Sequence, residues 1–330
     1  MNSRRKLVVG LGAAVVQAPW LAHAQQAGKV WRVGFVGFQS RPPALESHVF
    51  GGFPRGMREL GYVEGRNLAI EWRFADGKPE RLPELLAQLV QSKADVIVVS
   101  ASTVALAAQQ AATSIPIVFA AVNDPVSLGL VKSLGRPGGN ITGRANITDD
   151  LGPKRMELLL GMVPKATRIA VLVDSSGAAK GLRGDNLEVA AQKRRVKLLR
   201  VEAGTSQEIE HAFATMAREK VGALVVLFTP LFNQQRNQIA ELAAKHRLPT
   251  VAGDRFFVEA GCLMSYGASL TDDFYRLATY VDKIFKGAKP SDLPVEQPTR
   301  FELIINARTA ALLGLKVTAE LLLQADKVIE

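Results

Sequence analysis

The sequence predicts an α/β protein of two lobes, each built on a parallel β-sheet that is flanked by helices. Short runs rich in β-branched residues alternate with longer stretches of helical periodicity, which is typical of such sheets. The alternation stops at a segment rich in turn residues, Arg136–Gly143, and then starts again. A chain of 330 residues is also longer than one hydrophobic core usually serves. Each half, at roughly 120 residues, is too short for a (β/α)8 barrel.

The first half alternates predicted strands and helices. Strands are expected at Val30–Phe38, Asn67–Phe74, Asp95–Ser100 and Ile115–Ala120, and helices at Ser47–Leu60, Pro79–Gln91 and Ser102–Thr113. Gly61 is expected to end the first helix, because glycine adopts the left-handed conformation common after a helix. The strands predict one parallel sheet.

The second half repeats the pattern. Strands are expected at Arg168–Val173, Val196–Glu202, Ala223–Phe228, Pro249–Gly253 and Cys262–Tyr266, and helices at Leu187–Arg195, Ser206–Glu219 and Phe232–His246. The densest basic cluster outside the N-terminal segment, Lys193-Arg194-Arg195, is expected at the solvated end of a helix.

The last part of the chain predicts a return between the lobes. A long helix at Asp272–Lys286 precedes a proline-spaced segment, expected to be a crossing strand, and then a strand at Arg300–Ile305 and short helices up to Glu330. The leftover length suggests an N-terminal lobe of residues 25–147 plus about 268–292. A C-terminal lobe would hold residues 148–267 plus about 293–330. Several strands joining the lobes would form a hinge suited to closing on a ligand.

The first 24 residues have the features of a bacterial signal peptide. Arg4-Arg5-Lys6 precedes an apolar run, which ends at Ala22-His23-Ala24. The run is too short and too rich in glycine and alanine to span a bilayer comfortably. Ser3-Arg4-Arg5 fits a twin-arginine signal, and adjacent arginines also occur in general secretory signals, so both export routes stay open. No cysteine lies near the cleavage site, so a periplasmic protein without a lipid anchor is expected.

Composition argues against several classes of function. Loss of the signal peptide lowers the formal charge from +10 to +7, and the basic residues are dispersed, so nucleic acid is not an expected partner. His48, His211 and His246 lack the spacing of metal ligands, and no dinucleotide or phosphate-binding loop is present. Cys262 lies in an apolar run and is expected to be a buried structural thiol. An enzyme, a metal and a cofactor are therefore not expected.

Several short motifs along the chain resemble one family. They are Gly61–Asn67, Ile115–Phe119, Asn123–Val126, Arg136–Gly143, Gly261–Gly267, Lys286–Pro290 and Leu293-Pro294. In this order and spacing they resemble the ABC-transporter solute-binding proteins of the type I periplasmic-binding fold. The branch in question includes the tryptophan- and aromatic-amino-acid-binding proteins.

This resemblance implies two Rossmann-like, or flavodoxin-like, lobes joined by a multi-strand hinge. It implies a ligand bound between the lobes, delivery to a membrane ABC permease and its ATPase, and no catalysis. A monomer that binds a small polar solute, such as an amino acid or a derivative, is expected. The alternative is a module that presents its solute to a membrane sensor, because the two roles need the same cleft.

Ligands of parallel α/β sheets bind beyond the carboxyl ends of the strands, which gives the candidate residues of the first lobe. These are Gln39, Ser40, Ser100, Ser102, Thr103, Asn123 and Asp124. Ser102 starts a helix, where free backbone amides favour an anion, although a serine there can also be a simple cap. Asp124 could accept from an ammonium group, or form an Asx-turn that the next proline favours. In the family the matching Asp faces the cleft, and a Thr matches Ser102.

The second lobe offers Asp174, Ser175, Thr229 and Asp254 at equivalent positions. The family usually has Asn and Pro after the strand that ends at Val173, so Asp174-Ser175-Ser176 is a departure that leaves the solute open. Asp174 could select a cation or cap the next helix. Phe232 is expected to pack rather than stack on a ligand, and Asp254 is expected to face the cleft or to pair with Arg255.

Overall fold

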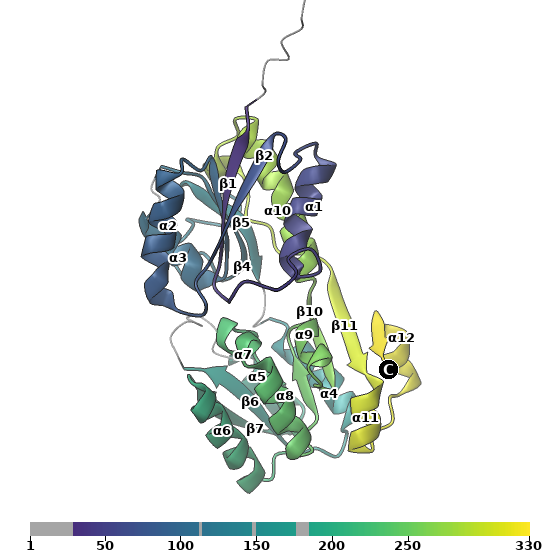
Figure 1. Ribbon diagram of the computed structural model, residues 1–330. Helices are drawn as coiled ribbons and strands as arrows, with labels where there is room; N and C mark the ends of the chain where they lie inside the picture. Colours follow the sequence, from purple (N-terminus) through teal and green to yellow (C-terminus); the bar gives the residue numbers. More distant parts are fainter. Residues whose placement is uncertain (1–28, 112–113, 147–149, 176–184) are drawn as a thin grey trace, which may run out of the picture.

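The computed structural model describes residues 29–111, 114–146, 150–175 and 185–330, which form two α/β lobes set end to end (Figure 1). The predicted signal peptide, residues 1–24, lies outside the described residues. Within the described ranges, no helix is long and apolar enough to cross a membrane. The predicted fold class, with two mostly parallel sheets, is confirmed.

The N-terminal lobe, or N-lobe, has a five-stranded parallel sheet in the order β2-β1-β3-β4-β5, which is the flavodoxin-like order. The strands are β1 (Trp31–Gly37), β2 (Leu68–Phe74), β3 (Val96–Ser100), β4 (Ile117–Asn123) and β5 (Ile141–Asn146). One face packs on α2 (Leu82–Gln91) and α3 (Ser102–Ala111), and the other on α1 (Gly52–Glu59) and α10 (Leu270–Phe285). With both faces covered, every residue of β3 is buried, which explains its apolar run.

The C-terminal lobe, or C-lobe, has a seven-stranded sheet in the order β12-β11-β10-β9-β8-β6-β7. Its strands are β6 (Arg168–Asp174), β7 (Lys197–Ala203), β8 (Ala223–Val226), β9 (Thr250–Ala252), β10 (Met264–Ala268), β11 (Phe301–Asn306) and β12 (Lys327–Ile329). Only the β10–β11 pair is antiparallel among the described pairs of this sheet.

Helices cover both faces of the C-lobe sheet. One face packs on α4 (Gly152–Met162), α5 (Asp185–Lys193), α11 (Ala307–Leu313) and α12 (Ala319–Gln324). The other packs on α6 (Ser206–Arg218), α7 (Pro230–Gln234), α8 (Arg236–Lys245) and α9 (Arg255–Glu259). Lys193-Arg194-Arg195 lies exposed where α5 ends, and Cys262 is buried, as predicted.

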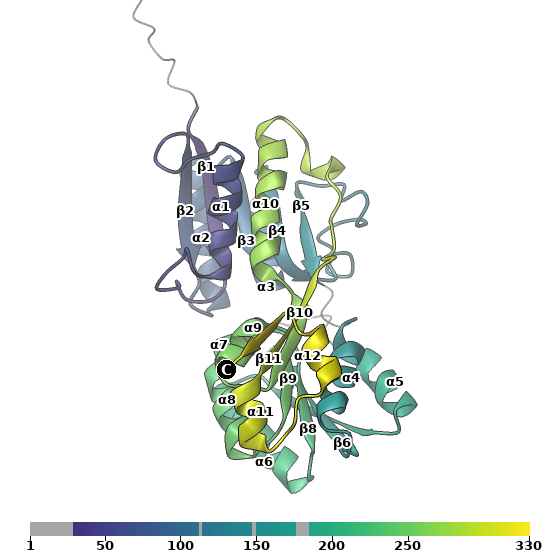
Figure 2. The same ribbon diagram turned by 90° about the vertical axis from the view of Figure 1, so that its right-hand side faces the viewer.

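Two described segments run between the lobes (Figure 2). The chain passes from β10 of the C-lobe to α10 of the N-lobe, and it returns through a 3₁₀ turn at Pro290–Asp292 to β11. α10 packs closely on α1, where a Cβ atom on Gly56 would lie 2.5 Å from the carbonyl oxygen of Tyr275. The lobe boundaries predicted near residues 147, 267 and 292 stay predictions.

The turn-rich segment Arg136–Gly143 was only partly predicted, because its end belongs to β5. Ile141 and Thr142 are buried beside β4, so tertiary packing overrides the local turn preference. Gly143 has φ of 150°, and a Cβ atom there would lie 2.1 Å from the carbonyl oxygen of Phe119. The glycine therefore serves a close approach between strands rather than a turn.

Other differences concern helices and the crossing segment. The predicted crossing strand is wrong, because the segment with Pro294 and Pro298 makes a single described bridge, Arg144 to Glu296. Prolines lack the amide hydrogen that a strand needs. The predicted helix at Phe232–His246 is two helices, α7 and α8, and the one at Ser47–Leu60 begins as a 3₁₀ turn. The sequence did not predict α4, α9 and β12.

Candidate functional site

A cavity lies between the lobes, at the carboxyl ends of β1, β3 and β4. The space between its atoms amounts to about 620 Å³ when the open solvent at its mouth is included. The lining residues are Phe38, Gln39, His48, Val49, Phe50, Ser100, Ala101, Ser102, Ala121, Asn123, Phe228, Pro230, Asn233, Phe256, Leu270 and Phe274. Residues of both lobes line it, so this interlobe cavity is the position at which ligands of open parallel sheets bind.

Aromatic rings form much of the cavity wall. Phe50 and Phe274 come from the N-lobe, and Phe228 and Phe256 come from the C-lobe. His48 stacks on Phe256 with ring centroids 5.5 Å apart, and it meets Phe50 edge-on at 4.5 Å. This stack joins the N-lobe to α9 of the C-lobe. The wall suits a solute with an apolar or aromatic body.

His48 is held in its neutral form. Burial, with a smaller contribution from the charge of Arg236, lowers its pKa to about 4. Its Nδ1 accepts a hydrogen bond from the backbone N–H of Phe50 at 3.3 Å, so the proton of the neutral ring is on Nε2. The imidazole therefore contributes a ring face and a donor rather than a charge.

The cavity floor has strained backbone. Ala101 and Ala121 both line the cavity and have positive φ angles of 79° and 55°, which alanine rarely adopts. Ala121 lies in β4 where the register with β5 shifts between Phe119 and Val122. Such strain costs about 1–3 kcal/mol per residue and concentrates at functional sites. Here it shapes the strand ends that carry Ser100 and Asn123.

Some polar groups of the cavity are buried without a partner. Ser100 Oγ, Asn123 Oδ1 and Asn233 Oδ1 have no hydrogen-bond partner among the described residues. Ser100 is only 5% exposed. The backbone N–H of Asn123 does have a partner, because it donates to Ser102 Oγ at 3.1 Å. Buried polar atoms are nearly always hydrogen-bonded, so these three oxygens are unusual.

The predicted N-lobe residues divide into two groups. Gln39, Ser100, Ser102 and Asn123 line the cavity, whereas Ser40, Thr103 and Asp124 are not among its lining residues. Asp124 is exposed, and its Oδ1 accepts from the backbone N–H of Ser127 at 3.1 Å, which is the Asx-turn alternative. Which of these residues binds a ligand stays a prediction.

The predicted C-lobe residues lie around the cavity rather than in its lining. Thr229 is buried and caps α7, with its Oγ1 accepting from the N–H of Phe232 at 3.2 Å. Phe232 is buried in the C-lobe core, so the packing role expected for it is confirmed. Asp174 is buried at the end of β6 and Ser175 is exposed.

Asp254 caps α9 and lines two small cavities that share Leu270 with the interlobe cavity. Its Oδ1 accepts from the backbone N–H of Phe256 at 2.7 Å. Burial raises its pKa to about 6, more than the hydrogen bond from Phe256 lowers it. Arg255 is hydrogen-bonded to Glu259 on the surface, at 2.7 Å.

Sequence reasoning missed most of the cavity wall. It considered strand ends, whereas His48 precedes a 3₁₀ turn, Phe256 lies on the unpredicted α9, and Phe274 comes from α10. Asn233 lay inside a predicted helix. The only local signal was the density of Phe residues near polar turns, which a packed core would also produce. No group of three potential ligands in the described part of the chain could hold a metal ion.

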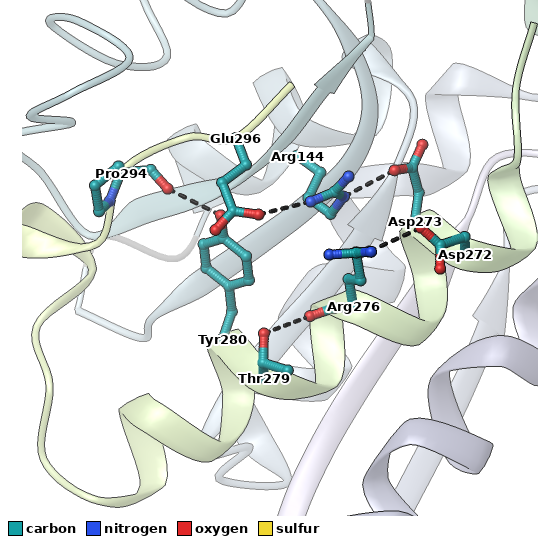
Figure 3. Close-up of polar contacts among 8 residues, drawn as sticks. All are labelled: Arg144, Asp272, Asp273, Arg276, Thr279, Tyr280, Pro294 and Glu296. Carbon is teal, nitrogen blue, oxygen red and sulfur yellow. Dashed lines mark hydrogen bonds and ion pairs between the residues drawn. The ribbon is translucent and has the colours of Figure 1, made fainter. Parts of the chain in front are cut away.

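We refer to the segment of residues 286–300, which crosses from the N-lobe to the C-lobe, and the parts of β5 and α10 that it contacts as the hinge. Charged side chains are paired there, and two of them, Arg144 and Asp273, are buried (Figure 3). Arg144 of β5, 3% exposed, donates from Nε to Asp273 of α10 and from a terminal nitrogen to Glu296 of the crossing segment, both at 2.7 Å. Burial raises the pKa of Asp273, and the guanidinium of Arg144 opposes this. The hydroxyl of Tyr280 donates to the carbonyl of Pro294 at 2.9 Å. These contacts fasten the crossing segment to the N-lobe.

The sequence model of the family described as ABC transporter substrate binding protein matches residues 38–329. This chain belongs to that family. The assignment agrees with the two-lobed fold and with the interlobe cavity, and it makes the chain a substrate-binding protein of the ABC transporter family with the type I periplasmic-binding fold.

Known proteins similar to this substrate-binding protein include a Tyrosine-binding protein of Clostridioides difficile (strain R20291). The two are 28% identical over 268 residues, which is 80% of this chain and 76% of that protein. A solved ABC domain in complex with L-Trp from Streptococcus pneumonia has a TM-score of 0.83 and 25% identity, covering 91% of this chain and 99% of that one. The ligand-free, open structure of a substrate-binding protein from Clostridium difficile has a TM-score of 0.69 and 26% identity, with the same coverage.

Proposed function

We propose that this chain is the solute-binding protein of an ABC importer and that it captures a small aromatic amino acid, or a close derivative, between its lobes. The observation that carries this proposal is the interlobe cavity, whose wall combines phenylalanine rings of both lobes with unpaired polar oxygens. Aromatic rings bind an apolar side chain, and oxygens fix a polar end. The names of the tyrosine-binding relative and of the L-Trp complex point the same way.

Closure of the lobes around the solute is part of this proposal. At nearly equal sequence identity and coverage, the chain superposes better on the L-Trp complex than on the open, ligand-free structure, with TM-scores of 0.83 and 0.69. The stack of His48 on Phe256 is a contact between lobes that such an arrangement allows. A solute bound to both lobes would stabilise this state over an open one.

The importer role rests on the family. A substrate-binding protein of an ABC importer delivers its solute to a membrane permease driven by an ATPase, and these are the partners we propose. The predicted signal peptide fits a periplasmic location. Loss of labelled L-tryptophan or L-tyrosine uptake after deletion of the gene would support import, and unchanged uptake would count against it.

Solute binding is tested with the protein lacking residues 1–24, by thermal shift and calorimetry. L-tryptophan and L-tyrosine should raise the unfolding temperature, because a ligand at 100 times its Kd adds about 2.7 kcal/mol to the free energy of unfolding. L-leucine and ribose should have little effect. Phe256→Ala should lower affinity about tenfold or more. Phe301→Ala is the matched control, since Phe301 is a half-buried ring of the C-lobe outside the cavity. No shift with either aromatic amino acid would refute the proposed solute class.

A further inference from the structure

The three unpaired oxygens of the interlobe cavity come from both lobes. Ser100 ends β3 and Asn123 ends the neighbouring strand β4, so both belong to the N-lobe. Asn233 lies on α7 of the C-lobe. Ser100 Oγ, Asn123 Oδ1 and Asn233 Oδ1 are all buried, all belong to residues that line the same cavity, and have no hydrogen-bond partner among the described residues. We refer to them as the acceptor triad.

The wall around the acceptor triad carries no formal charge. No Asp, Glu, Lys or Arg is among the described residues that line the interlobe cavity, and His48 is neutral. Asp124 is exposed and accepts from its own turn, and Asp254 caps α9 beside the cavity. The polar groups offered to a solute are therefore neutral. They include the oxygens of the acceptor triad, the hydroxyl of Ser100, which can also donate, and the Nε2–H of His48, which donates.

We propose that the acceptor triad holds the ammonium group of the solute, in place of a carboxylate. An ammonium group has three donors, which matches three oxygens, and each hydrogen bond between a charged and a neutral group is stronger than a neutral one. The ring of Phe274 in the same wall can also attract a cation. This inference rests on the proposed function, because it assigns one end of the proposed solute.

An ammonium group bound by the acceptor triad would also favour closure of the lobes. Because Asn233 belongs to the C-lobe and the other two oxygens to the N-lobe, an ammonium group bound by all three ties the lobes together. A solute without the ammonium group contacts the same rings but leaves the triad unpaired, which costs free energy. The solute class is therefore primary amines with an aromatic body.

The experiment compares amino acids with their deaminated analogues on wild type and on Asn233→Leu. Indole-3-propionate matches L-tryptophan, and 3-(4-hydroxyphenyl)propionate matches L-tyrosine, with the same ring and carboxylate but no amine. Calorimetry should show each amino acid bound at least tenfold more tightly than its analogue. Asn233→Leu should lower amino acid affinity about 10- to 100-fold and leave analogue affinity nearly unchanged.

The control is Asn237→Leu, the same substitution at an exposed position of α8 outside the cavity lining, which should bind as wild type does. The unfolding temperature of ligand-free Asn233→Leu should equal that of wild type, because no hydrogen bond of that oxygen is lost. Two results would overturn only the assignment of the ammonium group to the acceptor triad. One is a wild type that binds an amino acid and its analogue equally, and the other is an Asn233→Leu variant that binds as wild type does. A wild type that binds neither amino acid overturns the proposed function as well.

Discussion

The hinge and the interlobe cavity both contain buried polar groups, and the two regions differ in whether these groups are hydrogen-bonded. In the hinge, Arg144 is paired with Asp273 and Glu296, and the hydroxyl of Thr142 donates to the carbonyl of Leu293 at 2.6 Å. In the cavity, the oxygens of the acceptor triad have no partner among the described residues. Pairing fixes the shape of the hinge, whereas unpaired acceptors are available to a solute. The contrast separates structural polar groups from binding ones.

The largest effect is expected from breaking the hinge. Arg144→Met leaves the carboxylate of Asp273 buried and without its main partner, which should lower the free energy of unfolding by about 3–5 kcal/mol. Chemical denaturation followed by circular dichroism measures the loss. The double variant Arg144→Met/Asp273→Leu should recover most of it, because the uncompensated charge is gone. A loss below about 1 kcal/mol in the single variant would mean that the pair does not stabilise the hinge.

Two titratable groups near the cavity should make the free energy of unfolding depend on pH in opposite directions. Burial raises the pKa of Asp254 to about 6, so the stability it contributes is complete below about pH 4 and is lost as pH rises through 6. The pKa of His48 is lowered to about 4, so its contribution is present above about pH 6.5 and is lost as pH falls through 4. Between pH 4 and 6 the two slopes oppose each other in the wild type.

Single substitutions should separate the two slopes. Asp254→Asn keeps the helix cap but cannot ionise, so at pH 7.5 it should be more stable than wild type by roughly 2–3 kcal/mol, with no gain at pH 4. His48→Gln should remove the part of the stability loss at acid pH that protonation of His48 causes. This holds even if the variant is less stable than wild type at neutral pH. Urea denaturation from pH 4 to 8 measures both slopes. Asp124→Asn and His211→Gln, two substitutions of the same kinds at exposed positions, are the controls. Identical profiles for all variants would contradict the prediction.

Much of the fold could be predicted from the sequence, because parallel strands covered on both faces are apolar along their whole length. β3 and β6 are examples, with ends within a residue of the expected ones. β5 could not be predicted, since its Gly143 indicates a turn unless the backbone of Phe119 is known to lie against it. The segment around Pro294 was expected to be a strand, but prolines limit it to one described bridge.

The candidate site was harder to predict than the fold. Strand ends in a parallel sheet meet at one edge, which brought Ser100, Ser102 and Asn123 into the prediction. Phe256 and Phe274 reach the cavity from helices far along the chain, and only the packing of the lobes brings them together. Asp124 has φ of 38° and accepts from its own turn, a local geometry that residue type alone does not distinguish from a cleft-facing carboxylate.

The smallest expected effect is a difference in stability between variants at two buried hydroxyls of the N-lobe. Thr142→Val removes the donor to the carbonyl of Leu293 and should lower stability by about 1–2 kcal/mol, because a buried hydrogen bond is lost. Ser100→Ala removes a hydroxyl that has no partner among the described residues, so stability should be unchanged or rise by up to about 1 kcal/mol. Denaturant titration of the ligand-free variants at one pH gives both values. Because both side chains are buried in the same lobe, differences in exposure do not explain a difference in stability between the two variants. Equal losses in the two variants would mean that Ser100 is a structural group like Thr142, and the distinction between hinge and cavity would not hold for hydroxyls.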